Sequence, residues 1–74
     1  MSRLPQVNPR KLIAALKRAG FTEYDQEGSH LVLVNKEQDL QTTVPVHSGD
    51  VGRGLLKKIL KQARLSEDVF RKLL

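Results

Sequence analysis

The sequence predicts an α+β domain in which helices cover one face of a three-stranded antiparallel sheet. Three observations carry this prediction. An amphipathic helical pattern comes first, three strand-like segments separated by turn signals follow, and two further helical patterns complete the 74 residues. This order gives a two-layer architecture, α-β-β-β-α with a short C-terminal helix. The second face of the sheet is expected to stay open.

The first helix is expected to begin directly after a short N-terminal segment. We expect residues 1–7 to form a flexible lead and residues 8–74 to form a single domain. Asn8 is a good N-cap, and Pro9 loses nothing at the first helical position because its missing N–H would have no helical partner. Gly20 can adopt the left-handed conformation that ends a helix. The apolar positions that share one face of this helix are Leu12, Ile13, Ala15, Leu16 and Ala19.

Three strands are expected between residues 21 and 46. The first covers residues 21–26, with strict alternation, and Glu27-Gly28 signals a tight turn. The second covers residues 29–35 and is the most apolar, and the polar residues 36–39 form the next hairpin loop. The third covers residues 40–46. Pro45 cannot donate a ladder hydrogen bond, so this strand is expected at the sheet edge or to end there.

Residues 47–54 contain three glycines and are expected to form a loop. A second helix follows over about residues 55–63, with an apolar side that includes Leu56 and Ile59. Ser66 is expected to cap a final short helix, whose first turn carries Glu67 and Asp68, where negative charge is favourable.

The charge balance favours a polyanionic partner. Lys and Arg total 13 against 8 Asp and Glu, which gives a formal charge of +5. The chain has no cysteine, which excludes disulfides and Cys-rich zinc sites and favours a reducing, cytoplasmic compartment. The first residues show no secretory signal, and the longest aliphatic run, residues 31–34, is far too short to span a membrane. We therefore expect nucleic acid or an acidic protein as partner, and no membrane.

A stripe of basic residues on the second helix is the first candidate site. Its members fall within about 80° of arc beside the apolar face, and no acidic residue interrupts residues 51–65. We interpret the stripe as a phosphate-binding ridge, and the alternative is an ordinary solvated face. The basic ridge consists of Arg53, Lys57, Lys61 and Arg64.

The two histidines are the second candidate. Imidazole can take and give a proton near neutral pH, and RNA cleavage through the 2′-hydroxyl needs a base, an acid and a cation for the phosphorane. His30 begins the second strand and His47 lies in the glycine-rich loop. The alternative for each is a hydrogen-bonded structural histidine. Two histidines without ligand spacing predict no metal site, and neither a nucleophilic triad nor a phosphate-loop motif is present.

Four segments in register resemble the HicA family of bacterial toxins. Gly28-Ser29-His30 resembles the family's GSH motif at the start of a strand, and residues 44–47 (VPVH) resemble its V-P-x-H element. Residues 12–21 (LIAALKRAGF) resemble its first helix, and residues 54–63 (GLLKKILKQA) resemble its GTLxxILxxA helix. Two departures are Leu31, where many relatives have a second His, and Leu55, where a Thr is usual.

The resemblance implies the toxin of a type II toxin–antitoxin system with a fold similar to a double-stranded RNA-binding domain. It implies a metal-independent endoribonuclease that cleaves mRNA without a small-molecule cofactor. His30 matches the family's catalytic His, with His47 as the fallback candidate, and Ser29 together with the basic ridge is expected to contact RNA. It also implies a HicB-type antitoxin. We expect this antitoxin to be net acidic, to cover His30 and to contact Lys57, Lys61 or Arg64.

Two other functions remain open at the level of sequence. A domain with the α-β-β-β-α order could hold structured RNA without cutting it. Alternatively, the basic face could dock an acidic protein partner. Incubation with a long mRNA, with and without EDTA, separates these alternatives from the ribonuclease.

Overall fold

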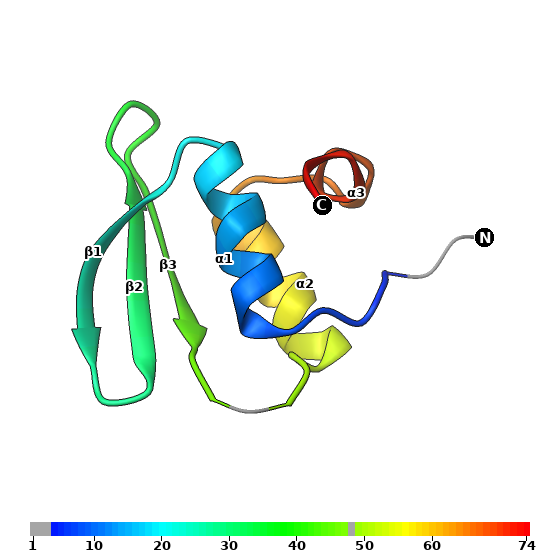
Figure 1. Ribbon diagram of the computed structural model, residues 1–74. Helices are drawn as coiled ribbons and strands as arrows, with labels where there is room; N and C mark the ends of the chain where they lie inside the picture. The colour runs from blue at the N-terminus through cyan, green and yellow to red at the C-terminus, as the bar shows by residue number, and fades with distance from the viewer. Residues whose placement is uncertain (1–3, 48) are drawn as a thin grey trace.

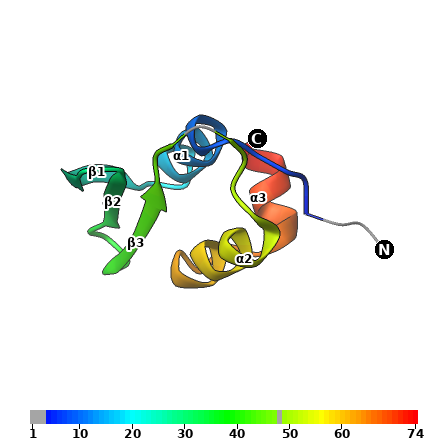
Figure 2. The same cartoon turned by 90° about the horizontal axis from the view of Figure 1, so that it is seen from below.

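A computed structural model describes residues 4–47 and 49–74. The elements in chain order are α1 (Pro9–Arg18), β1 (Thr22–Glu27), β2 (His30–Asn35), β3 (Leu40–Pro45), α2 (Arg53–Gln62) and α3 (Glu67–Leu73). The strands lie on one side of the molecule and the helices on the other (Figures 1 and 2). This α+β arrangement confirms the predicted fold class and is compatible with a double-stranded RNA-binding-domain-like fold.

Both ends of α1 follow the local rules that predicted them. The Asn8 side chain accepts a hydrogen bond from the Lys11 amide at 2.9 Å, and Pro9 occupies the first turn. Gly20 has a φ of 104°, and its amide and that of Phe21 donate to the carbonyls of the last helical turn. The chain therefore turns sharply into β1 at Gly20.

The sheet is antiparallel with the order β1-β2-β3, so β3 is an edge strand as Pro45 predicted. The β1–β2 hairpin turns at Gly28, whose φ of 57° suits the first central position of a two-residue turn. His30 is paired with Pro45, and the Val46 amide donates to the Ser29 carbonyl. The His30–Pro45 pair is therefore of the non-hydrogen-bonded kind, where proline costs the ladder nothing.

The helical layer covers β2 and β3 but not β1. Along β2, burial alternates, with Leu31 and Leu33 buried against the helices and His30 exposed on the opposite face. Every residue of β1 is exposed. We call the face of the sheet turned away from the helices the open face.

A β-bulge in β1 changes its predicted pattern of faces. The register shifts between Glu23 and Asp25, so Thr22 pairs with Val34 and Asp25 pairs with Val32, both on the open face. The strict alternation expected from the sequence placed Thr22 and Asp25 on different faces, and this expectation was wrong. Glu23 remains on the helical side and forms an ion pair with Lys17 of α1.

The segment expected to be a flexible lead contributes to the core over its described part. Leu4 is 3% exposed and Val7 is 2% exposed. The Val51 amide donates to the Val7 carbonyl at 2.8 Å, and the Arg53 side chain donates to the Leu4 carbonyl at 3.2 Å. Residues 4–7 therefore differ from the expectation and fix the entry into α2, while residues 1–3 lie outside the described part.

Helix α2 ends two residues before the basic ridge does. The Leu65 amide donates to the Leu60 carbonyl and the Arg64 amide donates to the Lys61 carbonyl, which is the hydrogen-bond pattern of a Schellman motif. Arg64 is the left-handed residue of this motif, with a φ of 55°. Arg64 therefore lies beyond the helix, and its predicted place on the helical stripe was wrong.

Helix α3 closes the core from the C-terminal side. The Ser66 side chain accepts from the Val69 amide at 3.2 Å, as the sequence predicted, and Phe70 is fully buried. Arg18 of α1 donates to the Leu73 carbonyl at 2.6 Å and ties the two helices together. No helix among residues 4–47 and 49–74 is long and apolar enough to cross a membrane.

Candidate active site on the open face

His30 lies on the open face at the end of the sheet nearest the β1–β2 turn. Its neighbour Leu31 points to the core and is 5% exposed, so His30 points away from the helices. Its cross-strand partners are Glu27 on β1 and Pro45 on β3. His30 is exposed and therefore accessible to a large substrate.

His47 reaches the same end of the sheet although it is 17 residues further along the chain. Val46 packs against the core after Pro45, and the Val46–Ser29 hydrogen bond continues the strand ladder by one residue. His47 follows in a bend beyond the end of β3, and its side chain is exposed. The residues that immediately precede the two candidates are therefore hydrogen-bonded to each other, and both candidates lie at the same end of the sheet.

Ser29, the predicted RNA contact of the GSH motif, lies in the hairpin turn immediately before His30 and is exposed. Leu31, the departure at the second histidine position, faces the core and leaves the open face unchanged. The other departure, Leu55, is 40% exposed on α2. Gly52, the N-cap of α2, makes no side-chain capping bond.

The structure does not bring the basic ridge to His30. Gln62 marks the sheet side of α2, because the Thr42 hydroxyl of β3 donates to its side-chain oxygen at 2.8 Å. Arg53, Lys57 and Lys61 are turned by about 100–180° from Gln62 around the helix axis. Lys57 and Lys61 instead line a hollow with residues 65–67, at the entry to α3. The basic ridge therefore lies on the far side of α2 from the sheet.

A different cation lies on the sheet side of α2. Lys58 is only about 40° from Gln62 around the helix axis, and it is exposed. Lys58 lies outside the basic stripe and was therefore not among the residues predicted to contact RNA. The order of the basic residues alone could not show which flank of the helix faces the sheet.

The surroundings of His30 on β1 are acidic. Asp25 and Glu27 both share the open face with His30 and are exposed. The overall charge of +5 favoured a polyanionic partner, but the basic residues are concentrated on the helices. The bulge in β1 hides this arrangement from the sequence, since it shifts Asp25 onto the open face.

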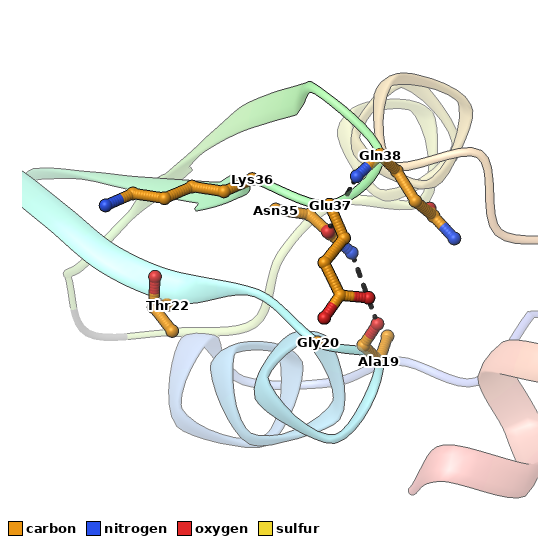
Figure 3. A pocket seen from close by; sticks show the side chains of 7 residues that line it. All are labelled: Ala19, Gly20, Thr22, Asn35, Lys36, Glu37 and Gln38. Atoms are coloured by element: carbon orange, nitrogen blue, oxygen red, sulfur yellow. Dashed lines mark hydrogen bonds between the residues drawn. The ribbon is translucent and has the colours of Figure 1, made fainter.

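The opposite end of the sheet holds a hollow of about 290 Å³ where α1 leads into β1 (Figure 3). Asn35 lies within it and is 5% exposed. Its amide nitrogen donates to the Ala19 carbonyl at 3.5 Å and its amide oxygen accepts from the Gln38 amide at 3.2 Å. These bonds tie the end of α1 to the β2–β3 loop, and this hollow has a structural role.

The titratable side chains offer no cluster with metal-ligand geometry. Within residues 4–47 and 49–74, no three His, Asp or Glu side chains lie close enough together to hold one ion. The chemistry available on the open face is proton transfer by the imidazoles of His30 and His47.

Comparison with known proteins identifies the family. The profile of the family described as HicA toxin of bacterial toxin-antitoxin matches residues 9–65. The matched region includes α1, the whole sheet and α2, and it ends just before α3. No curated protein matches the chain in sequence. Because the profile spans well over half of the 74 residues, the chain belongs to the HicA toxin family and is a toxin of a toxin–antitoxin system.

Proposed function

We propose that this toxin is a metal-independent endoribonuclease that cleaves mRNA, with His30 as general acid or base. The observation that carries the proposal is the exposed imidazole of His30 on the one sheet face that no helix covers. A phosphodiester can approach this face without rearrangement of the fold. Family membership supplies the second support, because a toxin must damage an essential component of its own cell.

The chemistry needs only the RNA and side chains of this kind. A base withdraws the proton of a 2′-hydroxyl, the oxygen attacks the adjacent phosphorus, and the bond to the 5′-oxygen breaks as that oxygen receives a proton. Imidazole is suited to either transfer near neutral pH. A protonated imidazole also places a positive charge beside the developing phosphorane charge.

The position of the basic ridge suggests how RNA is held. An RNA strand that reaches His30 and also contacts Lys57 or Lys61 must pass around the edge of β3 and across α2. Lys58 lies on the flank of α2 between these two regions. We propose that cations on α2 bind phosphates at a distance from the cleaved bond, which secures affinity without base recognition.

The antitoxin partner faces two different surfaces. Asp25 and Glu27 beside His30 disfavour an acidic cover over the open face, whereas Lys57 and Lys61 favour one over α2. We propose a HicB-type antitoxin that covers His30 with a neutral or basic segment and reaches the basic ridge with an acidic one. Mixing the toxin with the product of the neighbouring reading frame should abolish both cleavage and RNA binding.

The first experiment incubates the purified protein with a long mRNA, with and without EDTA. Fragments with a 2′,3′-cyclic phosphate and a 5′-hydroxyl, formed equally in EDTA, are the expected result. Binding without fragments would favour a non-catalytic RNA-binding module, which the acidic neighbours of His30 make a reasonable second candidate. Neither binding nor cleavage would leave a domain that docks an acidic protein.

A further inference from the structure

Cleavage through the 2′-hydroxyl requires two proton transfers at opposite ends of one phosphorus centre. One group removes the proton from the attacking oxygen, and another delivers a proton to the leaving oxygen. A single imidazole at His30 supplies only one of these transfers in a concerted step. The second group must lie close to His30 on the open face.

The fold brings the backbone at the second histidine to the same end of the sheet as His30. The chain has two histidines in 74 residues. His30 is directly opposite Pro45 in a non-hydrogen-bonded pair, where the two α-carbons are about 4.5 Å apart. His47 lies two residues beyond Pro45, in a bend after the end of β3, and the bond from the Val46 amide to the Ser29 carbonyl joins the residues that immediately precede His47 and His30.

The other groups that face His30 are less suited to the task. Asp25 and Glu27 approach from β1, while the open-face residues of β3 are Gln41, Thr43 and Pro45, which do not titrate. The helices lie behind the sheet (Figure 2). A carboxylate repels the phosphate that it would have to approach, whereas an imidazole can serve as base or, once protonated, as acid.

We propose that His30 and His47 act together as the base and acid pair of the ribonuclease, an inference that rests on the proposed function. One imidazole takes the 2′-hydroxyl proton as the O2′–P bond forms. The other, already protonated, gives its proton to O5′ as the P–O5′ bond breaks. The products are a 2′,3′-cyclic phosphate and a 5′-hydroxyl. One proton is taken up and one is released, so no further reactant is needed.

The test uses an RNA whose 5′-leaving oxygen is replaced by sulfur, because a thiolate leaves without a proton from an acid. His30→Ala and His47→Ala should each lower cleavage of ordinary RNA by about 10²–10⁴-fold. The sulfur substrate should restore the rate of one of these variants, the one that lacks the acid, and not the other. Glu27→Gln is the matched control on the same face and should cut ordinary RNA within a few-fold of the wild type.

Thermal unfolding and affinity for a 2′-O-methyl RNA verify that each variant is folded and binds. Should His47→Ala fail to fold, His47→Gln keeps a hydrogen-bonding amide and removes the proton transfer. Wild-type cleavage by a folded His47 variant would overturn the pair and leave the proposed function intact. The pair would also be overturned if the sulfur substrate restored the cleavage rate of both histidine variants or of neither. A large loss of cleavage in Glu27→Gln alone would overturn it as well. A wild-type protein that does not cut RNA would refute the proposed function itself.

Discussion

Helices α1 and α2 end with the same hydrogen-bond pattern but with different residues at the left-handed position. Gly20 ends α1 with a φ of 104°, and Arg64 ends α2 with a φ of 55°. Left-handed backbone costs a side-chain-bearing residue about 1–2 kcal/mol, and glycine avoids this cost. Glycine also loses more entropy on folding. A Gly-to-Ala change therefore stabilises the folded state by about 0.4–1 kcal/mol, because it lowers the entropy of the unfolded chain.

Together, backbone strain and unfolded-state entropy predict that glycine at position 64 and alanine at position 20 change the free energy of unfolding in opposite directions. Arg64→Gly should stabilise the protein by about 0.5–1 kcal/mol, the relief of strain less the entropic loss. Gly20→Ala should destabilise it by about 1–2 kcal/mol, because a β-carbon there would also lie 3.1 Å from the buried Asn35 amide nitrogen. For a domain of this size, 1 kcal/mol shifts the melting temperature by about 4–8 °C.

The assay is thermal and urea unfolding followed by circular dichroism. Arg64→Ala is the matched control, because it removes the guanidinium group but keeps a β-carbon on the left-handed backbone of residue 64. It should be close to the wild type in stability. Equal stability of Arg64→Gly and Arg64→Ala would refute the argument that the backbone of residue 64, and not its charge, limits stability.

Three further predictions concern the core and the cations. Phe70→Ala should cost about 3–5 kcal/mol and abolish cooperative unfolding by circular dichroism, because Phe70 is fully buried. Replacing the basic ridge by alanine should lower the salt dependence of RNA affinity by nearly one unit per phosphate contact, and an unchanged log–log slope would mark it as a solvated surface. Lys58→Ala should reduce cleavage in low salt more than Lys57→Ala does, since Lys58 lies on the sheet side of α2.

The elements predicted well are those set by local rules. Local backbone preferences of single residues predict four of these features. They are the start of α1 at Asn8-Pro9, its end at Gly20, the edge position of β3 and the Ser66 cap. Element ends differ by one or two residues, as for α2, which begins at Arg53. The exposed position of His30 agrees with the alternation along β2, where its neighbour Leu31 is buried.

Features that depend on tertiary contacts were not predictable. Leu4 and Val7 carry no periodic signal, and only their contact with the loop before α2 shows that they belong to the core. The bulge in β1 occurs in a stretch without glycine or proline, so nothing marks it in the sequence. The side of α2 that faces the sheet became clear only from the Thr42–Gln62 hydrogen bond, which separates Lys58 from the basic ridge.

The most direct test of the central claim compares His30→Ala with the wild type in single-turnover cleavage of mRNA in EDTA. The affinity of each protein for 2′-O-methyl RNA is measured alongside, so that a loss of binding is not mistaken for a loss of chemistry. We predict that the rate falls by about 10²–10⁴-fold while affinity and melting temperature stay at wild-type values. A folded His30→Ala protein that cleaves at the wild-type rate would contradict the assignment of His30 to the reaction.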